Sequence, residues 1–150
     1  MILIDANILL YAYVQSSEHH DAARQWIETT LSKPEPVGLA WTTILAFLRI
    51  STNPRLLKSP LAAAEAVGIV SGWIESPTVT LLSPTARHWE ILSNLITEGQ
   101  ARGPLVTDAH LAALAIEHGA TLATNDRDYT RFPGLRILNP LDPQPRTVRH

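Results

Sequence analysis

Short apolar runs alternate with longer stretches of helical periodicity along almost the whole of this 150-residue chain. Strands are expected at 1–4, 79–82, 121–124 and 135–138, where the apolar runs are short. Helices are expected at 8–13, 19–32, 41–51, 60–75, 84–100 and 107–118, most of which carry apolar residues at i, i+3 and i+4 spacing. This alternation predicts an α/β fold with a mainly parallel sheet, in which ligands bind at the carboxyl ends of the strands.

The helix expected at 107–118 has the clearest boundary signals. Thr107 is of a residue type that caps helix N-termini, and Gly119 is of the type that most often closes a helix. The interior at 109–116 is almost entirely apolar, which predicts that this helix is buried on most sides.

Composition limits the classes of function that the chain can have. Hydrophobic residues make up 45% and charged residues 17%, which is typical of a globular domain. The absence of cysteine excludes a disulfide framework, a thiolate metal site and a cysteine nucleophile. The net charge of −2 is unlike that of a highly basic nucleic-acid coat protein, although the total does not show where the charges lie.

The ends of the chain predict its location and its domain boundary. No apolar run approaches the ~20 residues of a membrane span, and the opening Met-Ile-Leu-Ile-Asp has no basic region of the kind found in signal peptides. These features predict a cytoplasmic protein without a membrane partner. We expect one domain at 1–141, followed by a polar tail at 142–150.

Aspartates lie where the predicted strands end. Asp5 directly follows the first strand, Asp126 and Asp128 follow the strand at 121–124, and Asp108 lies in the first turn of the buried helix. One such aspartate alone is best explained as a helix cap or a salt-bridge partner. Several that converge raise one another's pKa unless a cation lies among them, and carboxylates suit Mg²⁺ or Mn²⁺.

Three stretches of the sequence together resemble PIN-domain ribonucleases of the VapC toxin type. They read Ile-Leu-Ile-Asp-Ala-Asn-Ile-Leu-Leu at 2–10, Thr-Asp-Ala-His-Leu-Ala-Ala-Leu-Ala at 107–115 and Leu-Ala-Thr-Asn-Asp-Arg-Asp-Tyr at 122–129. The stretch at 47–55, Phe-Leu-Arg-Ile-Ser-Thr-Asn-Pro-Arg, also fits one branch of that family. Each stretch alone is a weak signal, but their order, spacing and flanks match together over residues 2–141.

The resemblance implies a fold and an activity. The implied fold is a three-layer α/β/α domain around a mainly parallel sheet. The implied activity is that of a metal-dependent endoribonuclease, the toxin of a type II toxin–antitoxin pair, which hydrolyses RNA phosphodiesters by metal-activated water. The implied partners are RNA, a cognate antitoxin and a second copy of the chain.

The resemblance also implies roles for particular residues. Asp5, Asp108 and Asp126 would bind Mg²⁺ or Mn²⁺, and Asp128 would add an outer carboxylate or a water-mediated contact. Asn7 and Thr124 would orient the carboxylates through hydrogen bonds. Arg49 and Arg127 are further candidates for contacts with RNA phosphates.

One position departs from the family pattern. The family usually carries a glutamate directly before the Phe-Leu-Arg stretch, where this chain has Ala46, and no acid occurs between Glu35 and Glu65 to replace it. Ala46 cannot bind metal or orient water, so we expect this chain to cleave RNA poorly. The chain is either a naturally altered member or, as we favour, an engineered Glu→Ala variant, since a disabled toxic ribonuclease is easier to produce.

Two other functions stay open at this point. A catalytically silent PIN-like module would bind antitoxin or RNA without cutting. Another Mg²⁺-dependent phosphotransfer enzyme, such as a haloacid-dehalogenase-like phosphatase, would need a second aspartate two residues after Asp5, where this chain has Asn7.

Overall fold

The computed structural model describes residues 1–142, so residues 143–150 of the predicted tail lie outside the described residues. The strands are β1 (Ile2–Ile4), β2 (Val37–Leu39), β3 (Val79–Leu81), β4 (Thr121–Ala123) and β5 (Ile137–Leu138). The helices are α1 (Ala6–Tyr13), α2 (His20–Ser32), α3 (Trp41–Ser51), α4 (Ala63–Glu75), α5 (His88–Glu98) and α6 (Leu105–Glu117), with a 3₁₀ helix, η1, at Arg127–Arg131.

The strands form one five-stranded sheet in the order β3-β2-β1-β4-β5, and every neighbouring pair is parallel. The chain moves outward from β1 through β2 to β3 and then crosses to β4 on the other side of β1. The order therefore reverses between β1 and β4. In open α/β sheets a crevice forms at such a reversal, outside the carboxyl ends of the strands.

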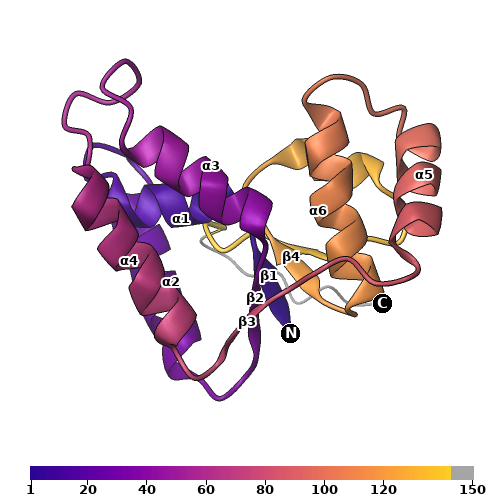
Figure 1. Ribbon diagram of the computed structural model, residues 1–150, viewed down its shortest axis with the longest axis horizontal. Helices are drawn as coiled ribbons and strands as arrows, with labels where there is room; N and C mark the ends of the chain where they lie inside the picture. The colour runs from indigo at the N-terminus through magenta and orange to yellow at the C-terminus, as the bar shows by residue number, and fades with distance from the viewer. Residues whose placement is uncertain (143–150) are drawn as a thin grey trace.

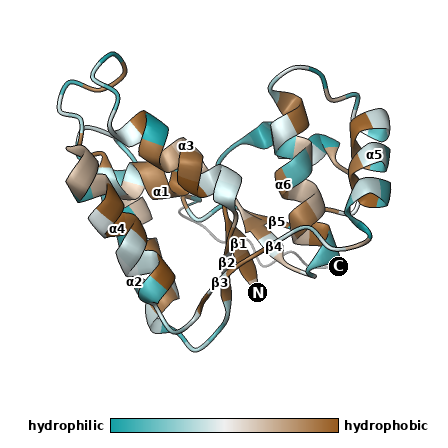
Figure 2. Cartoon of the chain, in the orientation of Figure 1, coloured by the Kyte–Doolittle hydropathy of each residue, from teal (hydrophilic) through white to brown (hydrophobic). Residues whose placement is uncertain are grey.

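Helices cover both faces of this sheet, with α1 to α4 on one side and α5 and α6 on the other (Figure 1). The side chains of adjacent residues in β1 point to opposite faces of the sheet, because side chains alternate along a strand. Leu3 packs in the cluster that contains α5 and α6, and Ile4 packs in the cluster that contains α1 to α4. The strands between these layers are predominantly hydrophobic (Figure 2). The predicted three-layer α/β/α fold is confirmed.

The sequence predicted some helix boundaries well and one cap wrongly. The expected helix at 41–51 is α3, and Gly119 closes α6 with a φ of +65°. Thr107, however, does not cap α6, because the helix already begins at Leu105, directly after Pro104. The ring of proline fixes a φ suited to a helix start, so Pro104 sets the boundary.

Two elements were not predicted from the sequence. Strand β2 contains only Val37, Gly38 and Leu39 and forms the centre of one half of the sheet, between β1 and β3. The 3₁₀ helix η1 follows Asp126, whose side chain accepts a hydrogen bond from the Asp128 amide. Within residues 1–142, no helix has both the length and the apolar character needed to cross a membrane.

The contact between the rings of Phe47, on α3, and Trp73, on α4, allows a test of core stability. Phe47 has no exposed surface, and its ring meets that of Trp73 edge-on at a centroid distance of 4.7 Å. We expect Phe47→Ala to lower the free energy of unfolding by about 3–5 kcal/mol, because it removes contacts and leaves a cavity. Urea denaturation measures the change.

The matched control for this core variant is Leu56→Ala, at a side chain that is 59% exposed. Its free energy of unfolding should change by no more than about 0.5 kcal/mol. Equal losses in the two variants would contradict the assignment of Phe47 to the core.

Candidate active site

A pocket of about 300 Å³ lies where the sheet order reverses, at the carboxyl end of β1. Its walls come from the residues after β1, from α3, from the start of α6 and from η1. The lining residues are Asp5, Ala6, Thr42, Thr43, Ala46, Arg49, Pro104, Thr107, Asp108, Leu111 and Tyr129. Segments that are far apart in the sequence thus bring two predicted acids and Ala46 into one pocket.

Asp5 is held at the end of β1 by two hydrogen bonds. Its Oδ1 atom accepts from the backbone amide of Ala6 at 2.8 Å, which caps α1, and its Oδ2 atom accepts from the Thr124 hydroxyl at 2.7 Å. The helix-cap explanation for a single aspartate therefore holds for Asp5. The same side chain also lines the pocket.

Thr124 connects the first and last acidic motifs. Its Oγ1 atom accepts from the backbone amide of Asp126 at 3.0 Å and from Nδ2 of Asn7 at 3.5 Å. Thr124 is 1% exposed, so these bonds lie in the protein interior. Asp126 is therefore fixed near Asp5 through one intervening side chain.

Burial and mutual repulsion set the electrostatics of the acids. Burial raises the pKa of Asp5 from 3.8 to about 6, with further increases from the charges of Asp108 and Asp126, against the opposing hydrogen bonds from Thr124 and Ala6. Burial also raises the pKa of Asp108, and the charges of Asp126 and Asp128 raise it further. The predicted acids thus lie close enough to disfavour one another's ionised forms.

The remaining predicted residues lie at different distances from the pocket. Arg49 lines it, whereas Arg127 is exposed and is not among its lining residues. Asp128 is also exposed. Its charge raises the pKa of Asp108, and its backbone amide donates to Oδ1 of Asp126 at 2.9 Å. The Oδ1 atom of Asn7 is buried and has no hydrogen-bond partner among residues 1–142.

The chemistry of the donors fits a hard divalent cation, although the ligand set is incomplete. Among the described residues, no three His, Asp or Glu side chains converge closely enough to hold a metal ion. Asp5 and Asp108 nevertheless line one pocket, and the pKa of each is raised in part by other carboxylates. A cation among them would relieve that repulsion, and carboxylate oxygens are what Mg²⁺ and Mn²⁺ prefer.

Sequence reasoning did not predict that three further residues lie beside the acids or in the pocket wall. The hydroxyl of Tyr129 donates to Oδ1 of Asp108 at 3.2 Å. The charge of Arg131 lowers the pKa of Asp108, and Thr43 lies in the pocket wall on α3. The only available signal was position: Tyr129 and Arg131 follow the last acidic motif, and Thr43 precedes Ala46 by almost one helical turn.

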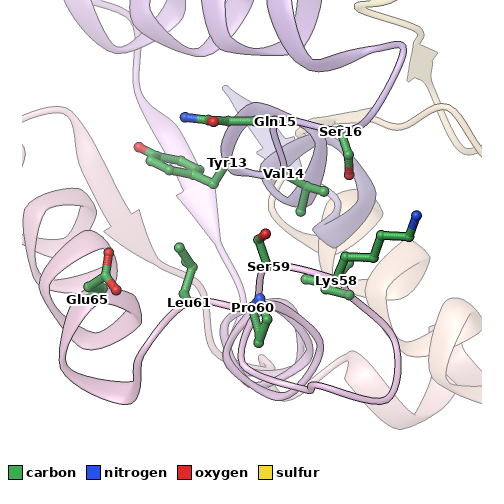
Figure 3. A pocket seen from close by; sticks show the side chains of 10 residues that line it. Tyr13, Val14, Gln15, Ser16, Lys58, Ser59, Pro60, Leu61 and Glu65 are labelled. Carbon is green, nitrogen blue, oxygen red and sulfur yellow. The ribbon is translucent and has the colours of Figure 1, made fainter.

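A larger cavity, of about 580 Å³, lies elsewhere in the molecule, between the segment after α1 and the segment that leads into α4 (Figure 3). Its lining includes Tyr13, Ser16, Lys58, Pro60 and Glu65. Within residues 1–142, its charged lining residues are Lys58 and Glu65, and none of the aspartates discussed above lines it. The smaller pocket is therefore the candidate active site, because it holds the clustered acids.

Comparison with known proteins places this architecture in a family. The sequence model of the PIN domain family matches residues 2–135. The chain belongs to the PIN domain family. Ribonuclease VapC37 of Mycobacterium tuberculosis is 43% identical over 140 residues, which are 93% of this chain and 97% of that protein. Ribonuclease VapC33 of the same species is 36% identical over 141 residues, 94% of this chain and 99% of that protein. The chain is thus a PIN-domain protein of the VapC ribonuclease type.

Solved structures show the same fold at lower sequence identity. VapBC2 from Rickettsia felis, bound to a DNA fragment from its promoter, superposes with a TM-score of 0.68 at 20% identity, over 93% of this chain and 98% of that chain. VapC20 of Mycobacterium tuberculosis, a toxin that cleaves the sarcin-ricin loop, gives 0.64 at 19% identity, over 91% of this chain and 99% of that chain. The PIN-domain architecture therefore extends over nearly the whole chain.

The raised pKa of Asp5 predicts a pH dependence of stability. With a folded-state pKa of about 6 and an unfolded value of 3.8, the folded state binds a proton more tightly at this carboxyl. The associated stability is present below pH 4 and is lost as pH rises through 6. Asp5→Asn lacks this titration, so its stability relative to the unsubstituted chain should rise by up to about 3 kcal/mol between pH 4 and pH 7.

Urea denaturation of both chains across that pH range, in buffer with a chelator, measures this change. The change with pH isolates the carboxyl, because any loss of the Thr124 hydrogen bond in the variant adds an offset that does not depend on pH. Glu35→Gln, at an exposed surface side chain, serves as the control. A stability difference that stayed constant with pH would contradict the raised pKa.

Proposed function

We propose that this chain is the toxin component of a type II toxin–antitoxin pair, built to hydrolyse RNA phosphodiesters with Mg²⁺ or Mn²⁺. The observation that carries the proposal is the convergence of Asp5 and Asp108 in one pocket, with Asp126 linked to Asp5 through Thr124. The names of the VapC ribonucleases at 36–43% identity support the same activity.

The proposal assigns a physical role to the charged side chains of the pocket and to two residues beside it, Thr124 and Asp126. Asp5, Asp108 and Asp126 would hold the cation, and Thr124 fixes the first and last of them relative to each other. When bound, the cation lowers the pKa of a water and neutralises charge on the phosphoryl oxygens. Among the described residues that line the pocket, Arg49 alone carries a basic side chain, so it is placed to contact a phosphate of the RNA.

Ala46 limits the activity of this chain. It lies in the pocket wall on α3, where a glutamate side chain would enter the space next to Asp5 and Asp108. With a methyl group there, the pocket lacks a carboxylate that would help to bind the cation or orient water. We therefore propose that the chain retains the fold and the pocket and cleaves RNA poorly.

Restoring the acid tests the proposal directly. We expect Ala46→Glu to cleave single-stranded RNA at least about 100-fold faster than the unsubstituted chain, because a positioned acid–base group typically contributes that much. Gel analysis of a labelled RNA pool with Mn²⁺ measures the rates. The chelator EDTA should stop the reaction.

The control for this assay is the double variant Ala46→Glu/Asp108→Asn, which keeps the shape of the pocket and should be inactive. Equal cleavage by the given chain and by Ala46→Glu would contradict the role of position 46. RNA binding by Ala46→Glu without any cleavage would instead favour a catalytically silent binding module.

The partners extend the proposal beyond the pocket. Solved relatives include toxin–antitoxin complexes from Rickettsia felis and Klebsiella pneumoniae. We propose that a cognate antitoxin binds this chain, and that RNA cleavage takes place in the cytoplasm. Co-purification with the protein from an adjacent reading frame would identify that antitoxin.

We also propose that the chain forms a homodimer through the outer face of α3. Trp41 and Leu45 lie one turn apart on that helix and are 53% and 60% exposed. Such apolar side chains on one helix face favour contact with a second protein surface.

The double variant Trp41→Ser/Leu45→Ser should shift the protein from dimer to monomer, as measured by sedimentation equilibrium. Val67→Ser on α4, at a residue 56% exposed, should leave the dimer intact, and a monomeric unsubstituted chain would contradict the proposal.

A further inference from the structure

Tyr129 makes a hydrogen bond that connects η1 to α6, the helix that carries Asp108. Its hydroxyl donates to Oδ1 of Asp108 at 3.2 Å, from η1 to the first turn of α6. Tyr129 is only 2% exposed and also lines the pocket. The donor therefore reaches Asp108 from the protein interior, where few water molecules can replace it.

The position of the phenol is fixed by contacts on two sides. Asp126 caps η1 by accepting from the Asp128 amide, and the amide of Asp126 itself donates to Thr124. On the other side, the ring of Tyr129 meets Phe132 edge-on at a centroid distance of 6.1 Å. The turn that carries Asp126 thus also determines where the Tyr129 hydroxyl lies.

The phenol is a permanent donor in this environment. Burial and the charges of Asp5 and Asp108 raise the pKa of Tyr129, so its hydroxyl keeps its proton. Its hydrogen bond favours the ionised form of Asp108 and so lowers the pKa of that carboxyl, against the effect of burial. The Tyr129 hydroxyl therefore constrains the orientation of the Asp108 carboxyl group, whose pKa is still raised overall by burial.

We infer that Tyr129 is a positioning residue, which sets the orientation of Asp108 relative to Asp5 and Asp126 for cation binding. This inference rests on the proposed function, because it assigns Tyr129 a role in the same pocket. The chain of contacts runs from Asp5 through Thr124 to Asp126, along η1 to Tyr129, and on to Asp108. The Tyr129 hydroxyl makes the last contact in this series, and the substitution Tyr129→Phe removes it without removing the ring.

Tyr129→Phe deletes that hydroxyl and keeps the ring in place against Phe132. Isothermal titration calorimetry with Mn²⁺ measures the consequence without any need for catalysis. The titration is made in the given chain and in its Ala46→Glu variant, where the added acid strengthens binding. We expect Tyr129→Phe to weaken Mn²⁺ binding about 10-fold, the lower end of the range for groups that orient metal ligands.

The matched control is Tyr13→Phe. The hydroxyl of Tyr13 accepts a hydrogen bond from Nε1 of Trp73 at 3.3 Å, in the other hydrophobic cluster. This variant also deletes one phenol oxygen with one hydrogen bond, and it should leave Mn²⁺ affinity unchanged. In an Asp108→Asn background, Tyr129→Phe should have less effect on the remaining affinity, because the carboxylate that it orients is gone.

The outcomes separate this inference from the proposed function. Mn²⁺ binding that is equal in Tyr129→Phe and the unsubstituted chain overturns the positioning role and leaves the metal site intact. Equal losses in Tyr129→Phe and Tyr13→Phe assign the effect to general stability and also overturn it. If neither the given chain nor Ala46→Glu binds Mn²⁺, the metal site of the proposed function fails, and the positioning role fails with it.

Discussion

The Thr124 hydroxyl is the interaction on which the acidic pocket depends. It donates to Asp5 at the end of β1 and accepts from the amide of Asp126 beyond the end of β4. These two strands are neighbours in the sheet, with Ile4 in register with Ala123. Asp5 and Thr124, each one residue beyond its strand end, can therefore reach one another. The parallel pairing of β1 and β4 thus fixes the Asp5 carboxylate relative to the backbone of Asp126.

This arrangement opposes stability and favours ligand binding. Buried carboxylates close to one another disfavour ionisation, and the raised pKa values of Asp5 and Asp108 reflect that cost. A fold selected only for stability would separate them. The charge total hides this concentration of acids. Without the four aspartates Asp5, Asp108, Asp126 and Asp128, the chain has twelve basic side chains and ten acidic ones. A net charge of −2 is therefore compatible with an anionic substrate such as RNA.

The sequence predicted those parts of the fold whose signals are local. Helix α3 was predicted with its observed bounds, because its apolar spacing is clear and Pro54 follows soon after its end. Strand β2 was missed because three residues with a central Gly38 carry no recognisable pattern; pairing with β1 and β3 makes them a strand. The start of α6 was misplaced because Thr107 is a good cap by type, whereas Pro104 acts earlier in the chain.

The clustering of the acids was predictable from the sequence, whereas the groups that orient them were not. Acids at the ends of neighbouring parallel strands converge by topology, so the strand pattern alone was enough to bring Asp5 and Asp126 to one edge of the sheet. Tyr129 was missed, since its hydrogen bond spans 21 residues and depends on how η1 turns toward α6.

Position 46 shows how separable the fold and the chemistry of this domain are. Ala46 lies on the pocket-facing side of α3 with Thr42, Thr43 and Arg49, while Phe47 and Ile44 of the same helix are in the core. Alanine is the best helix former, so its presence does not weaken α3. Removing a carboxylate from this pocket also relieves repulsion on Asp5 and Asp108. The residue that we propose to limit catalysis is therefore one that the fold tolerates without cost, as expected when an active site is maintained by function rather than by stability.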